Sequence, residues 1–306
     1  MRYRQLGRSG LTVSVVGLGC NNFGGRIDLD ASRAVVDAAL EEGVTLLDTS
    51  NTYGNRGGSE TVLGEVLAGR RDQVVLASKW GMDMGEGPGT ARGSRRYIHR
   101  AVEDSLRRLQ TDHIDLYQLH RPDPLTPIDE TLEALDDLVR SGKVRYIGSS
   151  NFAPWQVADA EWVARTRHLT RFVSAQNHYS LLERGVEAEL LPACEHFGVG
   201  VLPFFPLANG LLTGKYRRDQ PAPQGTRLAG RPVAAASYDT VEALTAFADS
   251  RGVGLLDVAI GGLAARPVVS SVIAGATRPE QVRANVAAGA WQPSGDDLAA
   301  LAKVLG

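Results

Sequence analysis

The chain has 306 residues, of which 43% are hydrophobic and 22% are charged, values that are ordinary for a globular protein. Its formal net charge of −2 gives no basic excess that would favour nucleic acid as a partner. The two cysteines, Cys20 and Cys194, form neither a disulfide framework nor a zinc motif. The N-terminus lacks the apolar stretch of a signal peptide, and no run of about 18 apolar residues predicts a membrane span. We therefore expect a cytoplasmic protein without a membrane or nucleic-acid partner.

The predicted elements begin with a short β-hairpin, formed by residues 3–6 and 12–15 around a turn at Arg8-Ser-Gly. Eight short, apolar and mostly β-branched runs follow, a pattern typical of strands that are buried on both faces of a parallel sheet. These runs lie at residues 16–18, 45–47, 74–77, 114–119, 144–148, 172–175, 200–202 and 271–274.

Amphipathic helices are predicted between these strands, and their ends carry recognisable signals. Asp30, Ser59 and Ser94 each precede a helical stretch in the position of an N-cap. A further helix starts at Thr126-Pro127 and ends at Gly142, because proline suits the first helical position and glycine the position after the last. The helices that follow Asp30, Ser59 and Ser94 cover residues 31–42, 60–68 and 95–109, and two more are predicted over residues 238–250 and 255–265.

The alternation of strands and helices predicts the architecture. Strict alternation indicates parallel βα units, and eight units in about 300 residues favour a closed (β/α)8 barrel over an open sheet. No low-complexity linker divides the chain. We therefore predict an α/β fold with a single (β/α)8 TIM-barrel domain over residues 1–306, an N-terminal β-hairpin and extra C-terminal helices.

Four polar side chains are predicted at the carboxyl ends of neighbouring strands, which is where such barrels carry their active sites. Asp48 follows the second strand and Tyr53 lies in the loop after it, while Lys79 ends the third strand and His120 ends the fourth. Neighbouring strands lie about 4.8 Å apart, so side chains from adjacent strand ends can converge on one place.

This set of side chains suits the reduction of a carbonyl group. Hydride addition to the carbonyl carbon leaves an alkoxide, to which Tyr53 can donate a proton. The free pKa of tyrosine is about 10, and we expect the nearby Lys79 cation to lower it. Asp48 can supply the opposite charge that a buried lysine needs. His120 can form a hydrogen bond to the carbonyl oxygen and orient the substrate.

Several spaced segments resemble the aldo-keto reductase family, and within it the bacterial reductases related to potassium-channel β-subunits. The resemblance extends from residue 6 to about residue 288. It implies that Asp48, Tyr53, Lys79 and His120 are the catalytic residues. The segments that carry it are Asp48-Thr-Ser-Asn-Thr-Tyr53-Gly, Ser59-Glu-Thr-Val-Leu-Gly64, Lys79, Asp115-Leu-Tyr-Gln-Leu-His120-Arg-Pro-Asp and Gly142-Lys-Val-Arg-Tyr-Ile-Gly-Ser-Ser-Asn-Phe152.

The resemblance also implies a cofactor, NADP(H), bound across the barrel mouth. No GxGxxG motif follows a strand, so a Rossmann-type nucleotide site is not predicted. By resemblance, Ser150, Asn151 and Gln176 hold the nicotinamide carboxamide and Phe204 stacks on the nicotinamide ring. The residues implied for the pyrophosphate and the adenosine are Pro206, Leu207, Gly210, Thr213, Lys215, Gly275, Thr277, Arg278, Gln281 and Asn285.

Arg278 is predicted to select NADPH over NADH. An arginine at a helix start can bind a 2′-phosphate through forked hydrogen bonds, helped by the helix dipole. Arg227 is a second phosphate candidate. Phe205, Ala274 and Ala284 depart from the family pattern, and we expect these departures to affect cofactor affinity rather than chemistry.

The leading hypothesis is therefore an NADPH-dependent enzyme that reduces an aldehyde or a ketone to an alcohol. Phe23, Trp80 and Phe152 are predicted to line its substrate pocket. The alternative is a regulatory binding module, because the channel β-subunits show that this fold can serve as a nucleotide-sensing partner. The intact set of four polar residues favours the enzyme. A metal-dependent barrel hydrolase is disfavoured, since the six histidines lack paired-ligand spacing such as HExxH.

Overall fold

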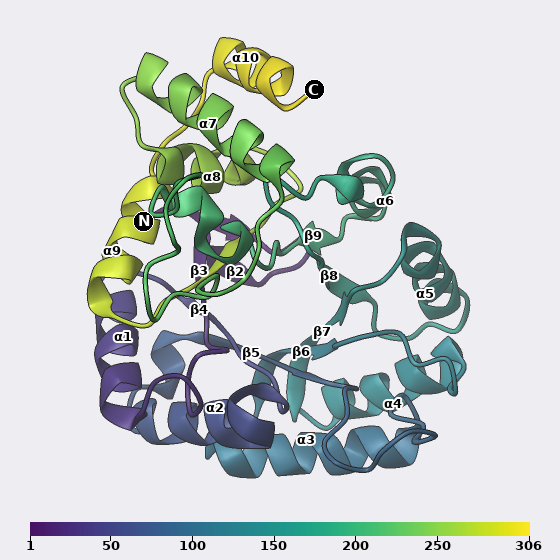
Figure 1. The fold of residues 1–306 in the computed structure, drawn as a ribbon. Coiled ribbons are helices and arrows are strands. Elements are labelled where there is room, and N and C mark those ends of the chain that lie inside the picture. Colours follow the sequence, from purple (N-terminus) through teal and green to yellow (C-terminus); the bar gives the residue numbers. More distant parts are fainter.

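The computed structural model describes residues 1–306, and its centre is an eight-stranded parallel sheet that closes into a barrel (Figure 1). The strands follow the order β10-β3-β4-β5-β6-β7-β8-β9. Backbone hydrogen bonds join Val201 of β9 to Val268 and Ser270, just before β10, and these bonds close the barrel. The strands are β3 (Val16–Gly19), β4 (Leu46–Asp48), β5 (Val75–Trp80), β6 (Ile114–Leu119), β7 (Val144–Ser150), β8 (Phe172–Gln176), β9 (Gly200–Val201) and β10 (Val272–Gly275).

The predicted (β/α)8 fold is confirmed. All eight predicted strands are present, each within a few residues of its predicted bounds. The predicted hairpin consists of β1 (Tyr3–Gln5) and β2 (Thr12–Ser14), which pair antiparallel as a separate two-stranded sheet.

The helices surround the barrel in chain order. In Figure 1, α1 to α5 follow one another around the outside of the strands, whereas α7 and α10 lie outside this ring at the top of the view. The helices are α1 (Leu29–Glu41), α2 (Tyr53–Val66), α3 (Arg95–Leu109), α4 (Ile128–Arg140), α5 (Pro154–Thr166), α6 (Leu190–Phe197), α7 (Ala235–Ser250), α8 (Leu255–Ala264), α9 (Pro279–Ala288) and α10 (Gly295–Leu305).

Four helix starts differ from the prediction, two of them, α4 at Ile128 and α7 at Ala235, by only one to three residues. The N-cap of α1 is Asp28, whose carboxylate accepts from the Ala31 N–H at 2.9 Å, so Asp30 lies in the first turn instead. The helix assigned from Tyr53 contains four residues, 54–57, with positive φ, and its regular part begins only after Gly57. The glycine at position 54 is required, because a Cβ there would lie 2.5 Å from the Phe23 carbonyl oxygen.

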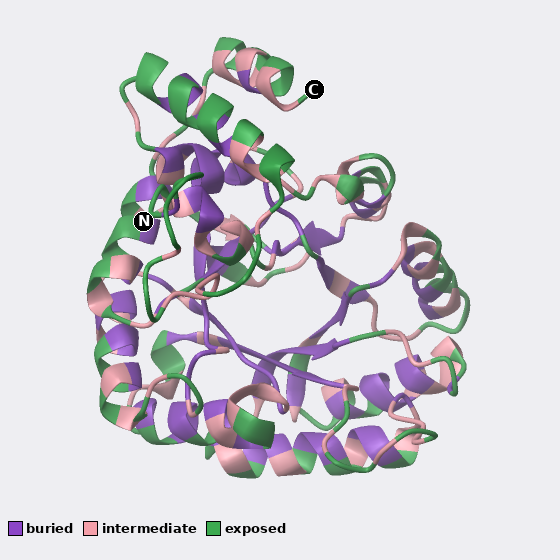
Figure 2. Cartoon of the chain, viewed as in Figure 1, coloured by how far each residue is buried: buried purple, intermediate pink, exposed green.

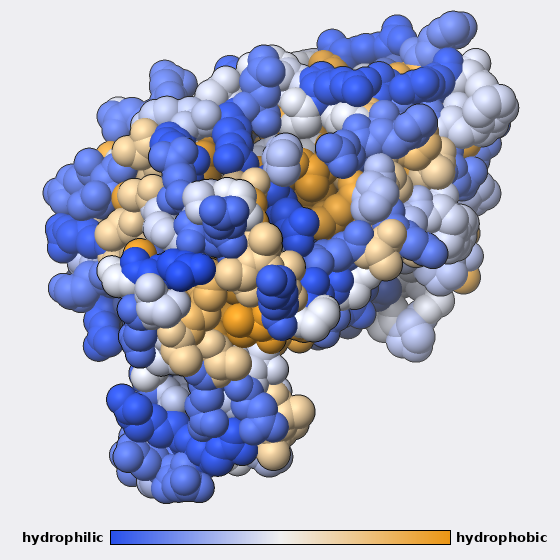
Figure 3. Space-filling model, turned by 90° about the horizontal axis from the view of Figure 1, so that it is seen from above, coloured by the Kyte–Doolittle hydropathy of each residue, from blue (hydrophilic) through white to orange (hydrophobic).

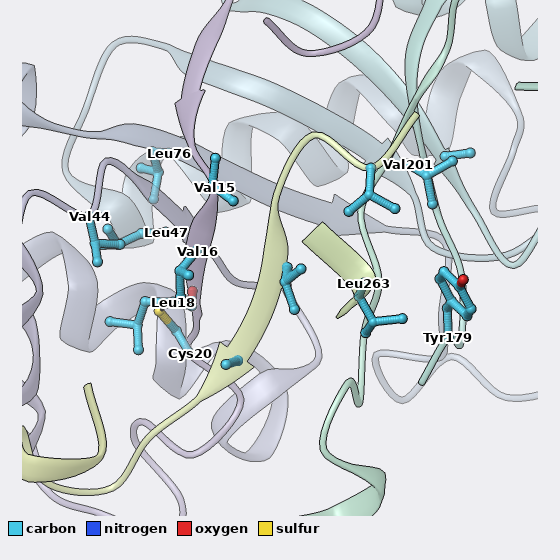
Figure 4. Close-up of a cluster of buried hydrophobic side chains, with 14 of the residues drawn as sticks. Val15, Val16, Leu18, Cys20, Val44, Leu47, Leu76, Tyr179, Val201 and Leu263 are labelled. Atoms are coloured by element: carbon cyan, nitrogen blue, oxygen red, sulfur yellow. Dashed lines mark hydrogen bonds between the residues drawn. The ribbon is translucent and has the colours of Figure 1, made fainter. Parts of the chain in front are cut away.

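Most of the core lies between the barrel and the helices. Figure 2 shows the strands buried and the helices buried on their inner sides only. A cluster of 66 buried residues fills this space. Figure 4 shows part of it, where Val16 and Leu18 of β3 lie near Val44, Leu47 and Cys20. Burying such apolar side chains removes them from water, which is the main force that holds the helices on the barrel.

A smaller cluster fills one end of the barrel interior, and we call it the inner apolar layer. Leu6 and Val13 come from the hairpin, which therefore closes this end of the barrel. The strands supply the other members, which are Leu46, Ala77, Leu116, Leu202 and Ile273.

In the view of Figure 3, hydrophilic side chains cover most of the exterior, and apolar side chains gather near the middle of the view. No helix of the structure combines the length and the apolar character that crossing a membrane requires.

Candidate active site

Polar side chains fill the other end of the barrel interior, at the carboxyl ends of the strands. They lie two residues beyond the inner apolar layer, because alternate residues of a strand face the same side. Strand pairing places Asp48 beside Ala77 and Lys79 beside Gln118. We call this group the polar layer, and its members are Asp48, Lys79, Gln118, Ser174 and Gln176.

Lys79 is the cation at the centre of the polar layer, and its side chain is completely buried. Its Nζ donates to Asp48 Oδ2 at 2.6 Å, to the Thr49 carbonyl oxygen at 2.9 Å and to Tyr53 Oη at 3.4 Å. An ammonium group has three donors, and all three are used. Burial alone would lower the pKa of Lys79, but Asp48 and Tyr53 together raise it above its ordinary value. Lys79 is therefore a cation at neutral pH.

The Asp48 carboxylate is held from its other side by two amides. Its Oδ1 accepts from Gln176 Nε2 at 2.9 Å and from Gln118 Nε2 at 3.3 Å. A buried carboxylate is stable only when its oxygens are paired. These bonds fix Asp48 and, through it, the position of the Lys79 ammonium.

Tyr53 lies against Lys79, whose charge acts on the pKa of the phenol. The Lys79 Nζ is 4.9 Å from the centre of the phenol ring as well as being within hydrogen-bond distance of the hydroxyl. Burial raises the pKa of Tyr53 above its ordinary value, and the Lys79 cation opposes this rise without reversing it. The Lys79 cation therefore acts in the predicted direction, but burial outweighs it, and the sequence does not show the depth of burial. At neutral pH the phenol is protonated.

His120 also lies against Tyr53. The two rings are edge to face, with centroids 5.8 Å apart and planes at 83°. Burial, together with the Lys79 and Arg121 cations, lowers the pKa of His120 to about 2. The imidazole is therefore neutral, and its Nδ1 lies 3.1 Å from Ser50 Oγ. The structure thus brings together all four side chains predicted at the strand ends.

Three side chains beside this group form a set suited to a primary amide. Asn151 Nδ2 donates to the His120 carbonyl oxygen at 3.0 Å and to Ser150 Oγ at 3.1 Å. Asn151 adopts a positive φ of 57°, which is rare for a residue with a side chain. The Asn151 Oδ1 and Gln176 Oε1 atoms have no protein partner and can accept, and the Ser150 hydroxyl can donate. A carboxamide offers two donors and one acceptor, so this set fits the nicotinamide carboxamide.

An aromatic and strained segment follows β9. Phe204 stacks on His178 with centroids 5.4 Å apart, and Phe205 is 38% exposed beside it. Positive φ occurs at Phe205, Ala208 and Asn209, none of which is glycine. Such strain concentrates at functional sites, where close approach of a ligand to the backbone demands it. The loop predicted for the pyrophosphate, including Pro206, Leu207, Gly210, Thr213 and Lys215, is this segment.

The segment predicted for the adenosine lies at the start of α9. Arg278 is the N-cap residue, is exposed and forms no ion pair or side-chain hydrogen bond within the protein. Gln281 Oε1 accepts from the Thr277 N–H at 2.8 Å, which orders the turn before the helix. Asn285 is buried, and its side chain likewise has no protein partner. The guanidinium of Arg278 is therefore free to bind an anion.

Arg227, the second phosphate candidate, is tied across the barrel mouth instead. Its Nη2 donates to Asn21 Oδ1 and Asn22 Oδ1, both at 3.0 Å. Its guanidinium also lies 5.6 Å from the Phe205 ring centre. Burial, with Arg26 nearby, lowers the pKa of Arg227. Unlike Arg278, it already has protein partners.

The three aromatic residues predicted for the substrate pocket are not brought to one open surface. Phe23 and Trp80 have no exposed surface, and Trp80 stacks on Tyr117 with ring centroids 4.5 Å apart. Phe152 packs edge to face on Phe172, and it borders two hollows of about 310 and 240 Å³, which are lined by the segments that follow β6, β7 and β8. Phe23 and Phe152 lie in loops, whose course the sequence could not show, whereas Trp80 ends β5 and faces away from the barrel interior because it follows the inward-facing Lys79.

Two charged residues of the segments that carry the family resemblance lie outside the site. Asp115 is at the opposite end of the barrel, where it pairs with Arg71 at 2.7 Å and Arg145 at 2.8 Å. Glu60 is completely buried and pairs with Arg108 at 2.7 Å, which ties α2 to α3. These residues hold the fold rather than the reacting atoms.

The Aldo/keto reductase family model matches residues 15–305 of this chain. The chain belongs to the aldo/keto reductase family. Its members are oxidoreductases, so the class of enzyme predicted from the sequence is confirmed at that level, and so is the resemblance itself.

The sequences of several known proteins match almost the whole length of this aldo/keto reductase. An uncharacterised oxidoreductase, YrpG, of Bacillus subtilis is 42% identical over 299 residues, which cover 94% of this chain and 91% of the relative. A probable voltage-gated potassium channel subunit beta of Oryza sativa is 36% identical, with 94% and 91% covered. An L-glyceraldehyde 3-phosphate reductase of Escherichia coli is 34% identical, with 94% and 87% covered. The predicted kinship with bacterial reductases and channel β-subunits is thereby confirmed.

Sequence reasoning missed two residues that contact the four polar side chains of this aldo/keto reductase. Gln118 binds Asp48, and Ser50 binds His120. Each stands two residues from a predicted site residue, Gln118 before His120 and Ser50 after Asp48. The period of two along a strand was the signal that could have found both.

Proposed function

We propose that this chain is an NADPH-dependent oxidoreductase that reduces an aldehyde or a ketone to an alcohol, with Tyr53 as the general acid. One observation carries the proposal. The Lys79 ammonium is bound between the Asp48 carboxylate and the Tyr53 hydroxyl, at 2.6 and 3.4 Å, and a neutral His120 lies beside the same phenol. Protonation of an alkoxide requires an acid, a cation that stabilises the conjugate base of that acid, and a neutral hydrogen-bond donor.

Each of the four side chains has a separate role in the reaction. When bound, NADPH supplies the hydride that adds to the carbonyl carbon. The Tyr53 hydroxyl then transfers its proton to the carbonyl oxygen as negative charge develops there, and the product alcohol keeps that proton. The Lys79 ammonium stabilises the phenolate that remains, and Asp48 keeps the ammonium charged and in place. His120, being neutral, offers an N–H to the oxygen and helps to position it.

The raised pKa of Tyr53 supports this direction of proton transfer. A phenol that is protonated at neutral pH is ready to act as an acid. The phenolate formed in the reaction would be costly in a buried site without an opposite charge. The Lys79 cation reduces that cost.

Three parts of the chain would hold the cofactor. Ser150, Asn151 and Gln176 offer the hydrogen-bonding groups that a carboxamide needs, and Phe204 offers an aromatic face. The free guanidinium of Arg278 at the N-terminus of α9 suits the 2′-phosphate, since both the side chain and the helix end favour an anion. This phosphate is the only chemical difference between NADPH and NADH.

A regulatory, nucleotide-sensing role is the second candidate, and the 36% identity to a probable potassium channel subunit beta favours it. One assay separates the two. The protein is mixed with NADPH and a panel of aldehydes and ketones, and the absorbance of NADPH is followed. The panel includes phosphorylated aldehydes, because one relative is named a glyceraldehyde 3-phosphate reductase.

We expect carbonyl-dependent loss of NADPH absorbance with at least one class of compound. Cofactor binding without turnover across the panel would support the regulatory role and contradict the enzyme. Failure to bind either NADPH or NADH would contradict both roles.

A further inference from the structure

Ser50 is a buried hydroxyl that faces the catalytic group and has no assigned role. The loop after β4 continues the strand pairing with β5, since the Thr49 and Asn51 N–H groups donate to the Ala77 and Lys79 carbonyl oxygens at 2.9 and 3.0 Å. This extended backbone gives Ser50 the same orientation as Asp48, toward the barrel interior. Ser50 is completely buried, and its Oγ lies 3.1 Å from His120 Nδ1.

The contact matters because His120 is neutral. A neutral imidazole has one N–H, so one ring nitrogen is a donor and the other an acceptor. Only Nδ1 has a protein partner, and that partner is Ser50. The contact with Ser50 determines which ring nitrogen carries the proton. That choice decides whether Nε2 faces the substrate oxygen as a donor or as an acceptor.

The neighbouring hydroxyl and amide favour one of these arrangements. Ser50 Oγ accepts from the Thr52 N–H at 3.3 Å and lies 3.0 Å from Thr52 Oγ1, whose own proton can point to it. With Thr52 as the donor, the acceptors left for the Ser50 proton are His120 Nδ1 at 3.1 Å and, further away at 3.5 Å each, Asn51 Oδ1 and the Lys79 carbonyl oxygen. His120 Nδ1 is the nearest of the three and takes the proton. The proton of the imidazole then lies on Nε2.

We propose that Ser50 is a positioning residue that donates to His120 Nδ1 and thereby keeps His120 as the Nε2–H tautomer. This inference rests on the proposed function, in which His120 gives a hydrogen bond to the carbonyl oxygen. With the opposite tautomer, the lone pair of Nε2 would face the lone pairs of that oxygen, and the contact would be repulsive. Ser50 acts only through His120.

Nitrogen NMR of the resting protein tests the tautomer without any turnover. Protein labelled with ¹⁵N on its histidines is compared with the His120→Gln variant, which identifies the His120 signals. We expect a protonated Nε2 and an unprotonated Nδ1 in the natural protein, and a shift toward the other tautomer in Ser50→Ala. A protonated Nδ1 in the natural protein would overturn the proposal, as would an unchanged tautomer in Ser50→Ala.

Kinetics test the consequence. A net hydrogen bond of ordinary strength predicts that Ser50→Ala lowers kcat/KM for the carbonyl compound by roughly tenfold. The affinity for NADPH and the melting temperature should match those of the control Ser149→Ala. That control also removes a buried hydroxyl from the barrel, but one that binds only the Ser174 carbonyl oxygen, at 3.4 Å. A loss of cofactor affinity and stability in Ser50→Ala, without a tautomer change, would instead mark Ser50 as structural.

The two measurements also separate this inference from the proposed function. If no carbonyl compound is reduced but the NMR shows the Nε2–H tautomer and its loss in Ser50→Ala, the role of Ser50 stands and the proposed reaction fails. If reduction occurs and Ser50→Ala changes neither the tautomer nor kcat/KM, the reaction stands and the role of Ser50 fails.

Discussion

The inner apolar layer and the polar layer are built by the same strands, yet they are held together by different forces. Two residues along a strand, a step of about 6.6 Å, separate a side chain of one layer from its counterpart in the other. Apolar contacts are non-directional, so the inner apolar layer needs only the right volume. In the polar layer every buried group needs a partner of the right kind. The counterparts are Leu46 and Asp48 on β4, Ala77 and Lys79 on β5, and Leu116 and Gln118 on β6.

This difference determines what a substitution does. In the inner apolar layer, a smaller side chain leaves a cavity, and stability falls while the neighbours keep their roles. In the polar layer, the removal of one group leaves another buried and unpaired, so the effect passes along the contacts between Gln176, Asp48, Lys79 and Tyr53. Chemistry is thus concentrated where the barrel tolerates substitution least.

The largest effect is expected for Tyr53→Phe, which removes the acid and keeps the ring. Loss of a general acid predicts a fall in the rate of carbonyl reduction of roughly a hundredfold to ten-thousandfold. Binding of NADPH, measured by fluorescence titration, should survive. The matched control is Tyr117→Phe, because the buried hydroxyl of Tyr117 has no hydrogen-bond partner and does not reach the polar layer. Substantial reduction by Tyr53→Phe would show that another group donates the proton.

Lys79→Met should lower the rate by about a hundredfold, since it removes the charge that stabilises the phenolate. It should also shift the pH profile. Reduction uses protonated Tyr53, so the rate falls as the pH rises through the pKa of Tyr53. The Lys79 cation lowers that pKa, whereas burial and Asp48 raise it. Without the cation the pKa rises further, and the alkaline fall of any residual activity moves to higher pH. An unchanged rate and profile would assign Lys79 a structural role only.

Lys79→Met should also destabilise the fold, because it leaves the buried Asp48 carboxylate without its cation. Breaking a buried ion pair on one side costs about 3–5 kcal/mol. The double variant Asp48→Asn with Lys79→Met removes both charges, so it should recover much of the free energy of unfolding without recovering the rate. Denaturant unfolding of the single and double variants measures this difference. If the double variant were no more stable than Lys79→Met, the unpaired Asp48 carboxylate would not be the cause of the lost stability.

Leu116→Ala tests the other layer. The lost side chain leaves a cavity in the inner apolar layer, and the free energy of unfolding should fall by about 2–5 kcal/mol. The folded fraction should keep its kcat, because Gln118, two residues further along β6, keeps its bond to Asp48. A large loss of kcat at temperatures where the variant is folded would show that the two layers are coupled.

Much of the fold and of the site could be predicted from the sequence. The strands and the four polar side chains at their ends followed from residue patterns that depend on local geometry. Phe23 could not be placed in the same way, because the loop after β3 turns its ring into the protein. Trp80 follows Lys79 on β5, so its ring faces away from the barrel interior, and the alternation along the strand could have shown this. The net direction of the Tyr53 pKa also escaped prediction, since the sequence shows which charges lie nearby but not how completely water is excluded.

The smallest effect is expected at a site that belongs to neither layer. Arg278 is exposed at the N-terminus of α9 and has no partner in the protein, so Arg278→Ala should leave the fold, the rate at saturating NADPH and the affinity for NADH nearly unchanged. A charge-assisted pair with the 2′-phosphate is worth about 1.5–3 kcal/mol, and exposure to solvent and salt favours the lower part of that range.

We therefore expect the affinity for NADPH to fall by about tenfold in Arg278→Ala when both cofactors are titrated by fluorescence at one ionic strength. Arg283→Ala is the matched control, because Arg283 is exposed on the same helix but pairs with Glu41 at 3.3 Å. An equal loss for NADPH and NADH would mean that Arg278 contacts a group common to both cofactors. Equal affinities of the natural protein for the two cofactors would contradict the preference itself. If Arg278→Ala still prefers NADPH to NADH, another cation binds the 2′-phosphate. Arg227 is the next candidate, and it would have to release Asn21 and Asn22 to bind the phosphate.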